Sequence, residues 1–416
     1  MTSQLNLEQL RKQAKERVRK RRAAGQDAKL ADAQFELARE LGFASWPKLK
    51  AYVERLGLEQ PFRTDLDYYE GRANGIATVN GVSIAEARRD LAGRHGFTSW
   101  RQLRRHVEAM GAGQEPPTPF VLAYRAVEDN DRQTLVALLD RFPELVAQRG
   151  TNGNDLLGMT ADHEIATLLL DRGADPNRGN DYGWTKLHSA GDGNDCDLAR
   201  LLLAAGARTD LSARGDGGTP LIAALFWGHR EVAELLGREP QNLRVAAGLG
   251  DLQMIREIAG TPPAGAHRGY YRPHGGFPAW HPSDDPQEVL DEALVWAAKA
   301  GRVEAIRLLT ELGARVDADV YRGTPLTWAA ANGRVEAIRT LIELGADPNQ
   351  RGTFGGPSHG EGVTAIHLAA QSGQRDAVIA LLDAGADPLI LDDLHGGTAL
   401  GWARVGCHEE LADILP

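Results

Sequence analysis

The chain has 416 residues, of which 42% are hydrophobic and 25% are charged, and its net charge is −10. This length exceeds what one compact hydrophobic core usually serves, so several packing units are expected. No run of about eighteen apolar residues occurs, so no membrane-spanning helix is expected, and the basic N-terminus lacks the apolar segment of a secretory signal.

The charge is distributed unevenly along the chain. Residues 1–115 carry 21 Lys and Arg against 15 Asp and Glu, a net charge of +6, whereas the remaining residues carry −16. The two parts are therefore expected to attract each other weakly, or to attract different partners. Cys196 and Cys407 are far apart in the sequence. They are expected to be free thiols, which is typical of a reducing cytoplasm.

The first predicted helix, residues 10–22, is strongly basic and has a narrow apolar stripe at Leu10, Ala14 and Val18. A basic helix can bind nucleic acid. This one has no interleaved aromatic residues and no recognised nucleic-acid motif, so nucleic-acid binding is the weaker interpretation. We expect a solvated helix that docks on the acidic repeats.

Two copies of a helix–turn–helix module follow, at residues 30–57 and 84–111, and each contains a Gly-Phe-x-Ser-Trp turn. The serine can cap the second helix, and the Phe and Trp can close a small core between the two helices. The pattern predicts no structure for residues 61–81. Proline-bearing residues 114–119 are the best domain boundary, which predicts an N-terminal region at 1–115 and a second domain at 116–416.

The second domain is built on a unit whose clearest copy is residues 323–349. Thr324 and Pro325 predict the start of a short helix, and Gly333 predicts its end. Residues 335–344 predict a second helix with one apolar stripe, which Gly345 closes.

Copies of this unit recur along the chain. Residues 301–314 read GRVEAIRLLTELGA and residues 333–346 read GRVEAIRTLIELGA. A unit this small cannot bury its apolar face alone, so it must stack on its neighbours. We expect about nine repeats between residue 116 and the end of the chain, with insertions at 261–287 and 351–361.

These repeats resemble the ankyrin repeat. The resemblance is carried by Thr185-Lys186-Leu187-His188, Thr219-Pro220-Leu221, Thr324-Pro325-Leu326 and Thr364-Ala365-Ile366-His367, and by the Gly-Ala-Asp-Pro turns at 173, 345 and 385. It implies an all-α ankyrin-repeat solenoid preceded by a small helical N-terminal region, in which the threonine-linked histidines make hydrogen bonds between repeats. The tandem modules resemble those found ahead of ankyrin arrays in many bacterial proteins.

The resemblance also implies a binding function. Ankyrin arrays bind partners through their turn tips and the exposed faces of their first helices, so we expect a cytoplasmic, monomeric scaffold that recognises a protein on its concave side. The partner-binding residues implied by position are Asp181, Tyr182, Trp184, Tyr321, Arg322, Asn332, Glu361 and His395. The aromatic slot at Trp296, Trp328 and Trp402 is interpreted as packing between repeats rather than as a ligand site.

The two insertions carry a second hypothesis. They contain residue types suited to a metal or to acid–base chemistry, namely His274, His281, Asp284, Asp285, His359 and Glu361, together with Trp280. We expect Trp280, His281 and Asp284 to pack close to His359 and Glu361, in one surface with Tyr321. The alternative interpretation is that they are loop residues that satisfy turns and caps.

No motif assigns chemistry to these residues. The sequence contains no H-E-x-x-H helix, nucleophile elbow, phosphate-binding loop or cysteine zinc cluster. We therefore predict a non-enzymatic protein and assign no catalytic residue, metal or cofactor. The alternative function is a hydrolase or small-molecule-binding protein with a site beneath the 261–287 insertion.

Overall fold

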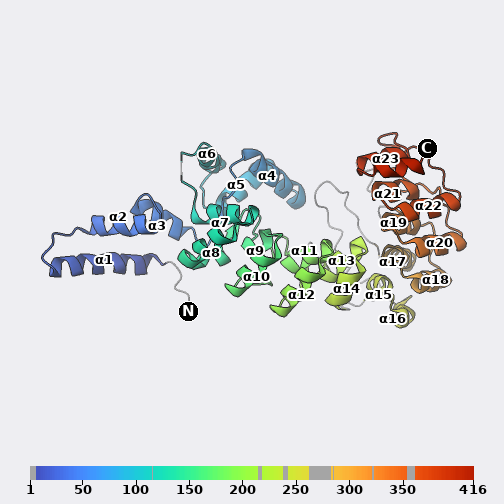
Figure 1. Cartoon of the computed structure of the whole chain (residues 1–416), viewed down its shortest axis with the longest axis horizontal. Helices are drawn as coiled ribbons and strands as arrows, with labels where there is room; N and C mark the ends of the chain where they lie inside the picture. Colours follow the sequence, from blue (N-terminus) through green and yellow to red (C-terminus); the bar gives the residue numbers. More distant parts are fainter. Residues whose placement is uncertain are drawn as a thin grey trace. The chain divides into compact units, whose positions relative to one another are not determined.

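The computed structural model describes residues 6–114, 116–213, 218–237, 242–261, 283, 285–320, 323–353 and 361–416. Within those ranges the regular secondary structure is almost entirely helical (Figure 1). The chain divides into two compact units, Met1–Asp181 and Tyr182–Pro416. The predicted all-α solenoid fold is confirmed. The proline-bearing linker at 114–119 lies inside the first unit rather than at its end.

The first module, formed by α2 (Leu30–Glu40) and α3 (Trp46–Glu54), packs with the basic helix α1 (Leu7–Ala23) in a three-helix bundle. The apolar stripe of the basic helix α1 is buried against α2 and α3. Arg17 and Arg21 of α1 form ion pairs with Glu40 and Glu36 of α2. The first module therefore occupies the helix face that the sequence predicts to dock on the acidic repeats.

The second module repeats this arrangement with α4 (Leu66–Asn80), α5 (Ile84–Arg94) and α6 (Trp100–Gly111). The side chains of Ser45 and Ser99 accept hydrogen bonds from backbone amides at the starts of α3 and α6, as predicted. Phe97 and Trp100 pack on the core of the second module, as their counterparts do in the first. Helix α4, for which the sequence predicts no structure, completes that core.

Both modules are joined to the repeats that follow them. Strand β1 (Glu59–Gln60) pairs in parallel with β2 (Arg149–Gly150). The side-chain amide of Gln148 donates to the Tyr52 hydroxyl at 2.7 Å, and both residues are buried. These non-local contacts explain why the first unit includes α7 (Pro119–Glu128), α8 (Arg132–Arg141), the 3-10 helix η1 (Pro143–Ala147), α9 (Leu156–Met159) and α10 (His163–Asp171).

The second unit stacks helical pairs, which Figure 1 colours from green to red. The inner helices are α11 (Lys186–Asp192), α13 (Pro220–Trp227), α15 (Leu243–Leu249), α17 (Pro286–Ala300), α19 (Pro325–Ala331), α21 (Ala365–Gln371) and α23 (Ala399–Val405). Their partners are α12 (Cys196–Ala204), α14 (Arg230–Leu236), α16 (Leu252–Ile258), α18 (Val303–Glu311), α20 (Val335–Glu343), α22 (Arg375–Asp383) and the 3-10 helix η4 (Glu409–Asp413). One continuous core of buried residues runs from Leu243 to Leu415.

The ends of the inner helices are linked in a ladder of side-chain hydrogen bonds. Arg302 donates to the Gly248 carbonyl at 3.1 Å, and Arg334 donates to the Lys299 carbonyl at 3.1 Å. Arg334 also donates to the Gly228 carbonyl at 2.7 Å, and the Lys299 ammonium donates to the Phe226 carbonyl at 2.9 Å. The end of α13 therefore lies beside the ends of α17 and α19. At this point the stack departs from the order of the chain, in which α15 comes between α13 and α17.

Within the described ranges, no helix is both long enough and apolar enough to cross a membrane.

Candidate functional site

Three exposed large apolar side chains of the second unit lie on the loop of residues 384–398, which joins α22 to α23. Leu389, Leu391 and Leu394 keep 58%, 51% and 39% of their surface exposed. His395, which the resemblance implies as a partner-binding residue, is exposed beside them. We call Leu389, Leu391, Leu394 and His395 the C-terminal tip.

A single buried carboxylate fixes the conformation of this loop. Asp392 is 3% exposed, and its oxygens accept hydrogen bonds from the amides of Leu394, His395 and Gly397 and from the Trp402 indole. Burial opposes the ionisation of Asp392, yet these four hydrogen bonds outweigh it and lower its pKa to about 2. The tip is therefore held as a rigid loop at all physiological pH values.

The buried side chain of His367 is hydrogen-bonded to the backbone of this loop. His367 forms a capping box with Thr364 at the start of α21. Its Nε2 atom lies 3.0 Å from the Ile390 carbonyl and 3.2 Å from the Gly397 carbonyl. Burial lowers the pKa of His367 below its ordinary value, so the ring is neutral at pH 7 and donates to the loop. His188 likewise reaches the Gly218 carbonyl of the next repeat, and the predicted structural role of both histidines is confirmed.

The turn that precedes α21, which contains Arg351 and Glu361, is bonded to the loop of the tip as well. The Arg351 guanidinium pairs with Asp393 and also donates to the Leu391 carbonyl at 3.1 Å. The Asp393 amide donates to the Glu361 carbonyl at 2.9 Å. Glu361 and His395, which the resemblance implies as tip residues of successive repeats, therefore belong to two turns that are hydrogen-bonded to each other.

The other predicted partner-binding residues are more dispersed. Asp181 belongs to the first unit, where its side chain is 18% exposed and pairs with Arg94 at 2.6 Å. Tyr182 and Trp184 are half-buried at the start of the second unit, and the Trp184 indole donates to Ser189 at 3.0 Å. Asn332 caps the end of α19 by donating to the Trp328 carbonyl.

The composite surface between the two insertions falls largely outside the described residues. His274, Trp280, His281, Asp284, His359, Tyr321 and Arg322 all lie outside them. Asp285 is described as the N-cap of α17, where its side chain accepts from the Gln287 amide. Among the described residues, no three His, Cys, Asp or Glu side chains converge in a group that could hold a metal ion.

The aromatic slot on the inner helices is buried, as the packing interpretation predicts. Trp296, Trp328 and Trp402 are 1%, 4% and 7% exposed. The Lys299 ammonium lies 3.8 Å from the centroid of the Trp328 ring. Lys299 is itself 2% exposed, so this slot holds a buried cation that the sequence analysis did not predict.

Sequence reasoning also missed the three leucines and Asp392. The signal was present in the segment LILDDLHGG at residues 389–397, because leucines stand there at positions that are polar in the corresponding NQRG turn at residues 349–352. The family resemblance predicts a contact only at the tip position, which is His395 here, and not at the leucines around it.

Comparison with known proteins gives consistent matches. The family described as Ankyrin repeats (3 copies) matches residues 158–247 and 243–352, and the family described as Ankyrin repeats (many copies) matches residues 326–382. Protein fem-1 homolog A-like from Mus musculus is 36% identical over 104 residues, which are 24% of this chain and 16% of that protein. Protein fem-1 homolog A from Homo sapiens is 32% identical over 145 residues, which are 34% of this chain and 20% of that protein. The chain thus spans a fifth or less of these relatives.

Proposed function

Because the chain belongs to the ankyrin repeat family, we propose that it is a cytoplasmic scaffold that binds a protein partner on the concave side of its array, with the C-terminal tip as the main anchor. Ankyrin repeats in general mediate protein–protein interaction. The proposal assigns the partner to a place on this array and assigns no catalytic step to the protein.

The observation that carries the proposal is the exposure of three leucines on a loop that does not need them for its own folding. Leu389 and Leu391 are more than half exposed, whereas the loop is held by Asp392 and by backbone groups. Exposed apolar clusters rimmed by polar groups are typical of protein-binding sites. A loop fixed before binding also loses little conformational entropy when a partner arrives.

The chemistry of the rim indicates what the partner must offer. The Arg351–Asp393 ion pair and His395 are exposed polar groups next to the leucines, and Arg351 also donates to the Leu391 carbonyl. An apolar side chain at the centre of the contact, flanked by hydrogen-bonding groups, would complement this surface. Tyr182, Trp184 and Asn332 are proposed as further contacts along the array.

The cytoplasmic assignment rests on the two cysteines. Cys196 and Cys407 are both free thiols, and Cys407 is exposed. An exposed thiol persists in a reducing compartment and is prone to oxidation elsewhere. The proposal treats the scaffold as a monomer.

Affinity capture from the native host with the full chain as bait tests the proposal. The bait variant Leu389→Ser/Leu391→Ser removes the apolar centre of the tip, and Ile379→Ser is the matched control, since Ile379 is 38% exposed on the outer helix α22. Proteins captured by the wild type and the control, and lost with the double variant, are the expected result. A capture profile that the double variant leaves unchanged would remove the C-terminal tip from the proposal.

A further inference from the structure

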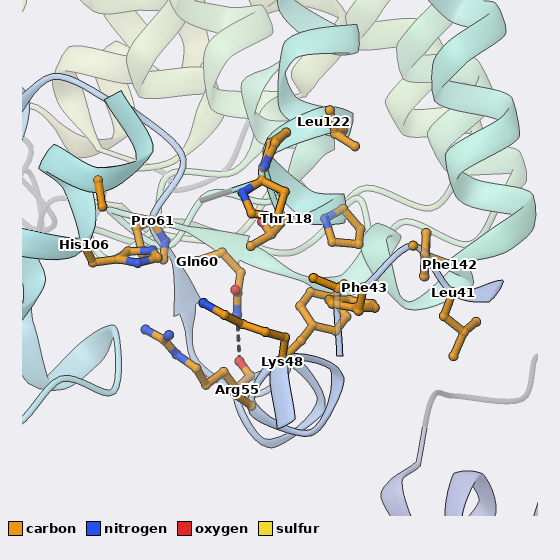
Figure 2. Close-up of a pocket in the computed structure, with 18 of the residues that line it drawn as sticks. Leu41, Phe43, Lys48, Arg55, Gln60, Pro61, His106, Thr118, Leu122 and Phe142 are labelled. Atoms are coloured by element: carbon orange, nitrogen blue, oxygen red, sulfur yellow. Dashed lines mark hydrogen bonds between the residues drawn. The ribbon is translucent and has the colours of Figure 1, made fainter. Parts of the chain in front are cut away.

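The first unit contains a cavity that the binding function of the array does not use. It has a volume of about 560 Å³ and lies where the first module, the second module and the first repeat helices meet. Its walls come from α3, α6, α7 and α8 and from the turns before them (Figure 2). Pockets that hold small organic ligands have volumes of about 300–1,000 Å³, so the cavity is of a suitable size.

Aromatic rings form much of the cavity wall. Phe43 and Tyr52 lie with ring centroids 5.0 Å apart, and Phe97, in the turn before α6, and Phe142, directly after α8, contribute two more rings. Tyr52 and Phe142 are 5% and 3% exposed. These residues are fixed by the core of the unit, so the apolar wall is preformed rather than assembled by a ligand.

Among the described residues, the charged side chains that line this wall all have the same sign. The cavity is lined by the four permanent cations Lys48, Arg55, Arg105 and Arg141, together with His106. No aspartate or glutamate is among the described residues that line it; Glu115, in the adjoining linker, lies outside the described residues. Most of the lining residues belong to residues 1–115, the part of the chain that carries a net charge of +6.

The contacts place two of the basic groups at one ring. The Arg55 guanidinium lies 4.4 Å from the centroid of the Phe97 ring, and the His106 and Phe97 rings are 5.3 Å apart. In the view of Figure 2, the nitrogen-bearing ends of Lys48, Arg55 and His106 lie toward one side of the cavity, and the apolar side chains of Leu41 and Phe142 lie toward the other. The cavity is therefore amphipathic.

We propose that this cavity binds a small organic anion that has an apolar, preferably aromatic, body and a carboxylate, sulfonate or phosphate head. The apolar body would pack on the rings of Phe43, Tyr52 and Phe97. The anionic head would accept charge-assisted hydrogen bonds from Lys48 and the arginines, which are roughly twice as strong as neutral ones. Walls of low dielectric and charges of one sign also concentrate anions at such a site.

Two fluorescent probes of nearly the same shape separate this proposal from simple apolar binding. The anionic probe is 1-anilinonaphthalene-8-sulfonate, and the neutral probe is N-phenyl-1-naphthylamine. Each is titrated into the full chain at low salt, where charge interactions are least screened. The test variant is Lys48→Gln/Arg105→Gln. The matched control is Lys50→Gln/Arg104→Gln, which changes the net charge equally, on the same two helices, at residues that do not line the cavity.

A third variant tests the location of the probe. Ala51 lines the cavity and is exposed, so Ala51→Trp fills the space without disturbing the buried core. We expect Ala51→Trp to abolish binding of both probes while the helical circular dichroism and the melting temperature stay those of the wild type.

The proposal predicts a specific pattern for the charge variants. The test variant should raise the Kd of the sulfonate by about tenfold or more and that of the neutral probe by less than about twofold. The control variant should change neither Kd by more than about twofold. Equal weakening by both charge variants, no weakening by the test variant, or sulfonate binding that survives Ala51→Trp would each overturn it.

Discussion

Glu144 offers a direct test of how the N-terminal modules are joined to the repeats. It lies in η1 beside the Tyr52–Gln148 contact, and it is 7% exposed. Neither of its carboxylate oxygens has a hydrogen-bond partner among the protein atoms that the structure describes. Burial raises the pKa of Glu144 from 4.5 to about 6.

The sign of the pH dependence follows from this shift. The folded protein holds the Glu144 proton more tightly than the unfolded chain does, so this group costs nothing below pH 4.5 and destabilises the fold increasingly as the pH rises through about 6. A shift of this size corresponds to about 2 kcal/mol at pH 8 as an upper limit. Solvent screening of the partly accessible carboxylate reduces the expected cost to about 1–2 kcal/mol.

The variant Glu144→Gln removes the charge and keeps the shape. The chain has two units, so global unfolding does not isolate this group, and hydrogen exchange of residues 143–150 measured by mass spectrometry is the better assay. At pH 8 the variant should exchange about tenfold more slowly than the wild type, after correction for the intrinsic rate. At pH 4.5 the two should agree.

A surface carboxylate provides the control for this measurement. Glu164 is exposed and pairs with Arg132 at 3.1 Å, so Glu164→Gln should change exchange little at either pH. If Glu144→Gln exchanged as the wild type does at pH 8, the carboxylate would already be solvated or partnered, and the argument from its burial would be wrong.

Three further predictions concern the second unit. Gly345 has a φ of +98°, and no atom lies near the position that a side chain would take. Gly345→Val should therefore cost about 1–3 kcal/mol of stability by backbone strain alone, and Gly345→Asn should cost less, because asparagine tolerates positive φ. Equal melting temperatures for the wild type and both variants would contradict this. Asp392→Asn should lower the free energy of opening residues 389–397 by about 1–2 kcal/mol at pH 7. The difference between variant and wild type should fade as the pH falls from 3.8 toward about 2. Unchanged hydrogen exchange of these residues at pH 7 would oppose the prediction. Glu292→Gln removes the carboxylate paired with Arg244, which is 1% exposed, and should cost about 3 kcal/mol; an unaltered urea midpoint would rule this out.

The repeat fold could be predicted because its signals are local. Thr219 and Thr324 cap the helices that begin one residue later, and Asn130 adopts the positive φ of 54° expected at a helix end. Each of these features depends on a few neighbouring residues. The pairing of Glu59 with Arg149 could not be predicted in this way. Strands β1 and β2 have two residues each, which is too short for a sequence pattern, and the two strands are far apart in the sequence.

The candidate site could be predicted only in part, for a related reason. The repeat template placed His395 and Glu361 on adjacent turns, and the structure bonds those turns together. The role of Asp392 depends on three backbone amides and on the Trp402 indole ten residues away. A sequence gives the residue types but not the direction of those amides, so the carboxylate appeared to be one more acidic turn residue.

The magnitudes involved indicate that the anchor proposed at the C-terminal tip needs further contacts along the array. Burying a fully exposed leucine contributes about 1.5–3 kcal/mol, and the three leucines are 58%, 51% and 39% exposed. Their combined burial therefore contributes only about 2–4 kcal/mol, which is at or below the minimum cost of association of about 4 kcal/mol. A stable complex needs further contacts, and the turn of Glu361 and the inner helices are the surfaces within reach of a partner seated on the tip. A partner that binds tightly must therefore extend along the array, and a peptide that copies only residues 389–395 should not compete with the full chain for it.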